Sequence, residues 1–216
     1  MRSQTLTIEQ RLSLPPAADT AGGRSDSRQC QVWLVLLALV NLGLLLGNVP
    51  AVNLAFDGPA VAAGEWWRLL TWPLVHVSRY HLLLDGAAFL LLYAGLEERR
   101  AARRLLLFAA CAAGSLLLPL AIAPQLRQLG LCGLSGVAHG LMAISALEMI
   151  RQRSQQSVGW VLLGGLLLKV AWELVTGTVV LEQLHLGDIG QPIVATHAGG
   201  VLGGLLGYAL FGRRGR

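Results

Sequence analysis

Six apolar segments, each close to the length needed to cross a lipid bilayer, limit what this chain can fold into. They cover approximately residues 32–49, 80–96, 105–123, 135–150, 158–180 and 193–211. A helix needs about 20 apolar residues to span a bilayer, where every backbone polar group must be bonded internally. Only 13% of the residues are charged, against about 25% in a typical soluble domain. The sequence therefore predicts an all-α polytopic membrane protein with six transmembrane helices, and argues against a soluble or disordered chain.

The arginines predict how the chain is oriented. Of the 16 arginines, 13 lie in the N-terminal tail, after the second segment, after the fourth segment or in the C-terminal tail. All these positions fall on one side of a six-span topology, so the positive-inside rule places both termini in the cytoplasm. Because the basic residues cluster between apolar segments rather than on one face, we expect the lipid bilayer, and not nucleic acid, as the partner of these charges.

The chain divides into three parts. Residues 1–30 contain Pro15, Pro16 and two glycines before the first apolar segment, and we expect a flexible cytoplasmic tail. Residues 31–212 form the predicted membrane domain, and 213–216 a basic cytoplasmic C-terminus. The longest loop, 50–79, contains Trp66, Trp67 and Trp72, an aromatic density typical of a segment in the membrane interface.

Polar residues inside membrane helices are costly and are therefore candidates for function. The run Gly133-Leu134-Ser135-Gly136 opens the fourth segment and suits either a nucleophilic serine or close packing of small residues. His197, in the sixth segment, shares a helix face with Gly200 and Gly204. It suits either a general base or a hydrogen-bonded packing residue.

Two more polar pairs have members four residues apart, which places each pair on one helix face. His81 and Asp85 lie in the second segment, and Lys169 and Glu173 in the fifth. The Lys169–Glu173 pair is most simply an internally neutralised ion pair. On this interpretation the fifth segment carries no catalytic candidate.

Three of these residues are predicted to lie at one depth. His81, Ser135 and His197 each precede by 16 residues a charged residue at the cytoplasmic end of their helix. That separation is about 24 Å along a helix, in a hydrocarbon core of about 30 Å. The sequence therefore predicts a recessed site about 6 Å below the outer surface, by the same two dimensions.

Together these motifs resemble those of the rhomboid intramembrane serine proteases. The resemblance runs from about Trp67 to Gly204 and rests on motifs that occur in the family's order. They are Trp67-Arg68, His76 and His81, Gly133-Leu134-Ser135-Gly136, and His197-Ala198-Gly199-Gly200 with Gly204. The serine motif continues to His139-Gly140, which more narrowly resembles the rhombosortase subgroup.

The resemblance implies a six-helix rhomboid-like bundle and an intramembrane serine endopeptidase without cofactor or metal. Ser135 would be the nucleophile and His197 the base, with His81, Asp85, Gly133 and His139 around the oxyanion. The subgroup implies membrane-anchored substrates with a C-terminal Gly-Gly, an apolar helix and a basic tail. It also implies the inner membrane of a Gram-negative bacterium, with the active site opening to the periplasm.

Two residues depart from the family pattern. His139 stands where most rhomboids have an aromatic residue; it could stack on His197, donate to it, or compete with it as base. Asp85 stands where the pattern has Asn. A protonated Asp85 could donate to an oxyanion, an ionised one could orient a histidine, and either could make a structural hydrogen bond.

Other functions are also compatible with such a chain. A rhomboid protease with other single-span membrane substrates would carry the same serine and histidine. A non-catalytic rhomboid-like module that binds helices would keep the fold but need neither residue. A small transporter is the third alternative, although no internal repeat is evident and the polar groups are predicted near one surface.

Overall fold

A bundle of long helices makes up most of the protein. The computed structural model describes residues 20–124, 126–180 and 186–212. The long helices are α1 (Thr20–Val40), α5 (Arg79–Gly95), α6 (Ala101–Ile122), α8 (Ser135–Arg151), α9 (Gln156–Thr176) and α10 (Ala195–Phe211). Short helices fill the connections: α2 (Leu42–Gly47), η2 (Val52–Leu54), α3 (Gly58–Ala62), α4 (Arg68–Thr71), η3 (Trp72–Leu74) and α7 (Leu126–Leu129).

The long helices from α5 onward begin and end within four residues of the predicted apolar segments. The first helix differs, because α1 begins at Thr20, inside the predicted flexible tail. Between Arg24 and Gln31 there is no Gly or Pro to stop the helix. In addition, the Tyr93 hydroxyl lies 3.2 Å from Gln29 Oε1 and ties this part of α1 to α5. Predictions for residues 1–19 and 213–216 lie outside the described residues.

Two of the described helices, α6 and α9, are long and apolar enough to cross a membrane by length and composition alone. Helices α5, α8 and α10 have 17 residues each, and the apolar part of α1 is shorter still. A 17-residue helix is about 25 Å long, less than the hydrocarbon core of about 30 Å. The predicted number of six spans therefore stays a prediction.

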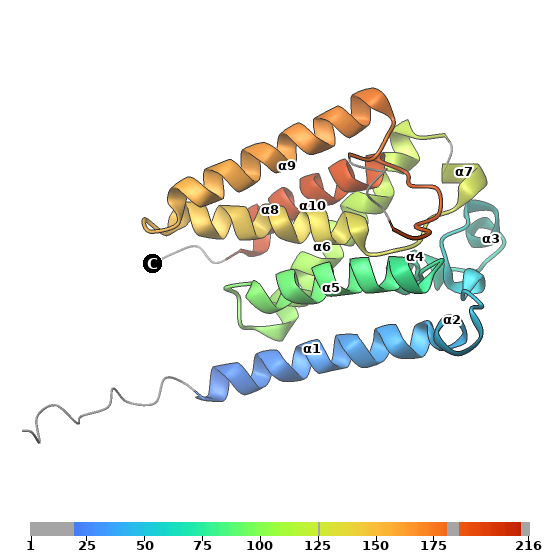
Figure 1. Ribbon diagram of the computed structural model, residues 1–216, viewed down its shortest axis with the longest axis horizontal. Helices are drawn as coiled ribbons and strands as arrows, with labels where there is room; N and C mark the ends of the chain where they lie inside the picture. Colours follow the sequence, from blue (N-terminus) through green and yellow to red (C-terminus); the bar gives the residue numbers. More distant parts are fainter. Residues whose placement is uncertain (1–19, 125, 181–185, 213–216) are drawn as a thin grey trace, which may run out of the picture.

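The two ends of the bundle differ in the connections and helix ends that they contain (Figure 1). The α5–α6 turn, the α8–α9 turn and the C-terminal end of α10 lie at one end. The two turns and the helix ends beside them carry Arg99, Arg100, Arg103, Arg104, Arg151 and Arg153. The opposite end carries the short helices α2 to α4 and α7, and the N-terminal ends of α5, α8 and α10. The arrangement separates the arginine-rich turns from the helix starts that carry the candidate site residues.

The segment 50–79 folds around the Arg68 side chain. Arg68 Nη1 donates to the carbonyls of Val52 and Ala55, both at 2.9 Å, and Nε donates to Glu65 at 2.6 Å. An isolated bridge between Phe56 and Leu131 joins the segment to the connection before α8. The segment is therefore a fixed part of the end that holds the candidate site.

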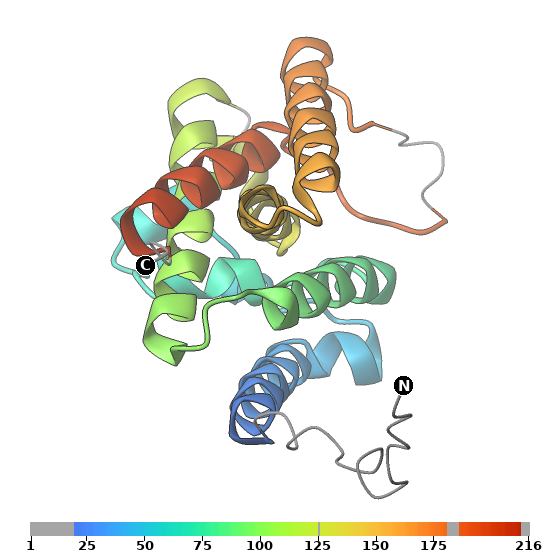
Figure 2. The same cartoon turned by 90° about the vertical axis from the view of Figure 1, so that its left-hand side faces the viewer.

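Helix α8 runs through the centre of the bundle, with α5, α6, α9 and α10 around it (Figure 2). Helix α10 packs closely on both α6 and α8 through glycines. A Cβ atom at Gly200 would overlap the carbonyl of Gly136 in α8, and one at Gly199 would overlap that of Gly114 in α6. Close backbone approach at small residues is how membrane helices gain contact when no hydrophobic effect drives them together.

This packing predicts that Gly200→Ala destabilises the protein. The added methyl group must push α10 away from α8, and overpacking of this kind costs about 1–3 kcal/mol. Thermal unfolding in detergent micelles measures the loss. Gly165→Ala in α9 is the matched control, because nothing lies within 4 Å of a Cβ at that position. Equal midpoints for the two variants would contradict this account of the packing.

Candidate active site

Ser135 is the first residue of α8, and the turn before it sets its position. Gly133 has φ +100°, and a Cβ there would lie 2.8 Å from the His81 ring and 2.9 Å from Asp85 Oδ2. Both the left-handed conformation and the space therefore require glycine. Leu134 N–H donates to Asp85 Oδ2 at 2.9 Å. The turn thus presents Ser135 at a helix N-terminus, where backbone N–H groups lack intrahelical acceptors.

His197 lies in the first turn of α10 and faces Ser135. Its Nε2 is 3.2 Å from Ser135 Oγ, although 62 residues separate the two in sequence. His197 is buried, and Ser135 is half-buried. The structure therefore brings together the two residues that the sequence singled out as nucleophile and base. The distance is that of a hydrogen bond between a serine and its base.

Glu173 of α9 contacts the other side of the same imidazole. Its Oε2 lies 2.8 Å from His197 Nδ1, and its Oε1 accepts from Lys169 Nζ at 2.6 Å and from Val180 N–H at 3.1 Å. The predicted Lys169–Glu173 ion pair is present, but the expectation that the fifth segment carries no catalytic candidate needs correction. The only sequence signal was a carboxylate within an apolar helix; no spacing rule linked it to His197.

These contacts set the tautomer of His197. An ionised carboxylate only accepts, so Nδ1 carries the proton that points at Glu173. Nε2 then has a lone pair directed at the hydroxyl of Ser135. This is the arrangement in which an imidazole acts as general base toward a serine.

His139 stacks on His197, with ring centroids 4.1 Å apart and planes at 12°. Its Nε2 lies 2.8 Å from Lys169 Nζ, and its Nδ1 lies 2.7 Å from the carbonyl of Ser135. A protonated lysine only donates, so Nε2 is the acceptor and Nδ1 donates to the carbonyl. Of the three roles left open for His139, this geometry matches stacking, since its lone pair faces Lys169 rather than the Ser135 hydroxyl.

His81 and Asp85 form a second polar group beside the serine turn. His81 Nε2 is 3.1 Å from Asp85 Oδ2, and His81 Nδ1 accepts from Val77 N–H at 3.5 Å. Asp85 Oδ2 thus accepts from both His81 and Leu134, and this oxygen is not available as an oxyanion donor. Of the open alternatives, the contacts match orientation of a histidine, but the histidine is His81 rather than His197.

His76 lies behind this pair, between η3 and α5. Its ring meets that of His81 edge to face at 5.0 Å, and its Nδ1 donates to the Leu74 carbonyl at 3.1 Å. The side chain is fully buried, and this burial lowers the pKa of His76 from 6.5 to about 4. His76 is therefore neutral at neutral pH.

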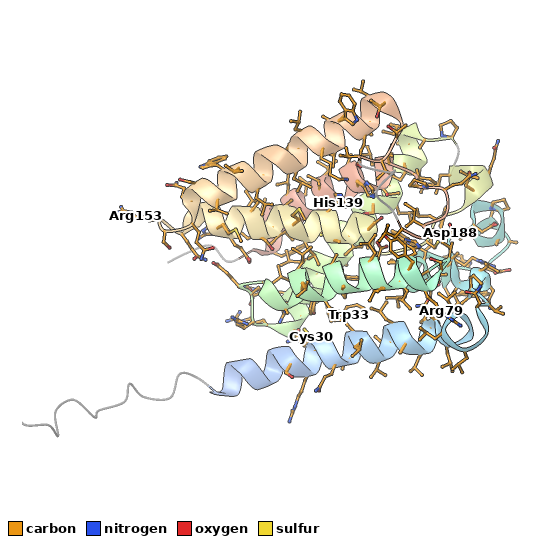
Figure 3. All side chains as sticks on the ribbon, in the orientation of Figure 1. Cys30, Trp33, Arg79, His139, Arg153 and Asp188 are labelled. Carbon is orange, nitrogen blue, oxygen red and sulfur yellow. The ribbon has the colours of Figure 1, made fainter. Side chains whose placement is uncertain are left out.

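A cavity of about 620 Å³ lies beside Ser135 and His197. Ser135, His139 and His197 line it together with His81, Asp85 and Lys169. Apolar residues of α5, namely Leu84, Ala88 and Leu92, line the same space. Figure 3 shows His139 far from the end that carries Arg153 and nearer to Asp188. Five of the predicted site residues, all except Gly133, thus line one cavity in the half of the bundle opposite the arginine-rich turns.

Three of these side chains could in principle hold a metal ion. Ligand atoms of His139, Glu173 and His197 lie within 4.8 Å of one another. Lys169 Nζ, however, already contacts His139 and Glu173 at 2.8 and 2.6 Å. Its ammonium supplies the positive charge that an ion would bring, so we assign no metal to this group.

Comparison with known protein families gives the family of this chain. Residues 63–214 match the family model of the Rhomboid domain, which covers the helices from α4 to α10. The chain belongs to the rhomboid family. Rhomboid proteins are generally intramembrane serine proteases, so this is a membrane protein of a protease family. Neither the curated proteins nor the solved structures gave a match.

The burial of His76 predicts that this rhomboid protein loses stability in acid. The unfolded chain binds a proton near pH 6.5, whereas folded His76 stays neutral down to about pH 4. Stability from this group is complete above pH 6.5 and falls by about 3 kcal/mol as the pH drops toward 4. Unfolding midpoints at pH 7.5 and 4.5 should therefore differ less in His76→Gln than in wild type. An equal pH dependence in both proteins contradicts the assignment.

Proposed function

We propose that this rhomboid protein is an intramembrane serine endopeptidase with Ser135 as nucleophile and His197 as general base. The observation that carries the proposal is the 3.2 Å contact between Ser135 Oγ and His197 Nε2 inside the cavity. The two residues come from separate helices, and close glycine packing holds those helices together. An alcohol and a correctly oriented imidazole in such a site are the parts that acyl transfer needs.

The reaction follows from this geometry. Ser135 Oγ attacks the carbonyl carbon of the scissile peptide while His197 Nε2 takes the hydroxyl proton. The resulting imidazolium returns that proton to the leaving amine as the C–N bond breaks, which leaves an acyl group on Ser135. Water then attacks the acyl group with His197 again as base, releasing the new carboxylate.

The developing oxyanion would be stabilised at the N-terminus of α8. There the Ser135 N–H and the positive end of the helix dipole point toward the reacting carbonyl. Because the His81 Nε2 proton is already directed at Asp85, we assign both residues a supporting role. Together with Gly133, they hold the turn that presents the Ser135 N–H.

We further propose six membrane spans, with both termini in the cytoplasm and the cavity opening to the periplasm. The arginine clusters at the α5–α6 and α8–α9 turns support this orientation, since both turns lie at the end opposite the cavity. The exposed Trp66 and Trp67 at the cavity end fit a membrane interface. The membrane would be the inner membrane of a Gram-negative bacterium.

For the substrate, we propose exported proteins whose C-terminal tail has a Gly-Gly motif, an apolar helix and basic residues. The continuation of the serine motif to His139-Gly140 supports this rhombosortase-like specificity. Glycine is a poor helix former, so a substrate helix unwinds at Gly-Gly at low cost and enters the site extended. A rhomboid protease with other single-span substrates is the alternative.

The catalytic assignment predicts that Ser135→Ala and His197→Ala abolish cleavage. Each variant is co-expressed with a Gly-Gly-tailed exported protein, and the shortened product is followed on immunoblots. We expect a loss of at least about a thousand-fold, as for other serine–histidine enzymes. Ser145→Ala, which removes another half-buried serine of α8, should cleave normally. Normal cleavage by Ser135→Ala or His197→Ala would contradict the assignment of these two residues. No cleavage and no labelling of wild type by a fluorophosphonate would favour a non-catalytic helix-binding module.

The substrate proposal makes a separate prediction. Replacing Gly-Gly by Ala-Ala in the substrate tail should reduce cleavage at least tenfold, because two alanines stabilise the helix by about 2 kcal/mol. Mass spectrometry of the new C-terminus identifies the cleaved bond. Equal cleavage of both tails would support the broader substrate range instead.

A further inference from the structure

Glu173 is a buried carboxylate, and its ion pair with Lys169 involves only one of its two oxygens. The side chain of Glu173 is fully buried, whereas that of Lys169 is 30% exposed. Lys169 and Val180 N–H both bond to Oε1. The other oxygen, Oε2, faces His197 Nδ1 at 2.8 Å. A buried charge costs several kcal/mol unless it is fully paired and hydrogen-bonded. The bond to His197 gives the second oxygen of this carboxylate its partner.

We propose that Glu173 is the positioning residue that orients His197, and that Lys169 holds Glu173 in place for this role. The inference rests on the proposed function, because it assigns the acid of a Ser135–His197–Glu173 chain. It adds a third helix to the catalytic machinery, since Ser135 lies on α8, His197 on α10 and Glu173 on α9. The site is complete only when α9 packs against α8 and α10.

The chemistry of the base explains why a carboxylate is needed there. When His197 takes the proton of Ser135, its ring becomes positive while it lies buried and stacked on His139. Glu173 Oε2 stabilises that charge through the Nδ1–H bond and keeps Nε2 directed at the serine. The proton stays on His197 throughout, and Glu173 stays ionised.

Every charged or titratable group packed on His197 fits this role. His139 of α8 is held as an acceptor toward Lys169, so it adds no positive charge. Lys169 of α9 is the one cation bonded to the group in the described part of the chain. Its charge balances Glu173 before the reaction. During the reaction the Glu173 carboxylate lies between the Lys169 ammonium and the His197 imidazolium, and its negative charge offsets their mutual repulsion.

The test compares Glu173→Gln with wild type in detergent, using a Gly-Gly-tailed substrate. Gln keeps the size and a hydrogen-bonding group but loses the charge. We expect kcat to fall by about 10²–10⁴-fold, with KM within about twofold because substrate binding does not use this residue. The acidic limb of the kcat/KM profile should move to lower pH, since an imidazolium without its carboxylate loses its proton more easily.

Glu148→Gln is the matched control. Glu148 is another buried membrane-helix glutamate, but it lies in the last turn of α8 and accepts from Glu97 N–H. This variant should keep the wild-type kcat and pH profile. Unfolding midpoints of both variants show that each is folded. Unchanged kcat and pH profile in a folded Glu173→Gln protein would overturn the proposal.

The role of Lys169 is tested by a double-mutant cycle. If Lys169 acts through Glu173, then Lys169→Met alone should lower kcat, and adding it to Glu173→Gln should lower kcat no further. A second full loss in the double variant would overturn this part. An unchanged kcat in Lys169→Met would also overturn this part.

These results are separable from the proposed function. If wild type cleaves and Ser135→Ala does not, the protease assignment stands even when Glu173→Gln is fully active. If wild type neither cleaves nor reacts with a fluorophosphonate at Ser135, the proposed function itself is wrong.

Discussion

The close backbone contact between α10 and its two neighbours is the constraint on which the rest of the structure depends. At Gly200 and Gly204 the helix approaches α8 so closely that no Cβ atom fits. Because a membrane gives helices no hydrophobic reason to associate, such contacts must come from packing and hydrogen bonds. The approach at Gly200, one turn after His197, brings the imidazole within 3.2 Å of Ser135. The Ser135–His197 contact is therefore a consequence of the packing rather than an addition to it.

The polar residues in the cavity are arranged so that each buried charge has a partner. Two carboxylates bond to groups on either side of Ser135. Asp85 accepts from Leu134 N–H and holds the turn in front of the serine, while Glu173 accepts from the histidine behind it. Each carboxylate also contacts a second group, His81 for Asp85 and Lys169 for Glu173. In a low-dielectric interior a buried polar group without a partner lowers stability much more than a paired one does.

The sequence was sufficient for those features that depend on local pattern. The helices from α5 onward follow the apolar segments. His81, Ser135 and His197, which share a 16-residue spacing to a charged residue further along the chain, line one cavity. The Lys169–Glu173 pair followed from its four-residue spacing. The contact of Glu173 with His197 could not be predicted, because it depends on which face α9 turns toward α10. The spacing of residues along the chain does not determine that orientation. The His81–Asp85 contact also follows from a four-residue spacing, whereas the bond from Leu134 N–H to Asp85 depends on how α5 packs against the turn before α8.

His139 shows how one substitution in a family motif changes what its surroundings must supply. An aromatic residue stacked on His197 would need only space, whereas a histidine has two polar nitrogens that must be bonded when buried. Here the Ser135 carbonyl satisfies one and Lys169 the other. Lys169 in turn needs an anion, which Glu173 provides while also bonding His197. His139, Lys169 and Glu173 are therefore physically one unit. Losing any one of them would remove a hydrogen bond from this unit beside His197.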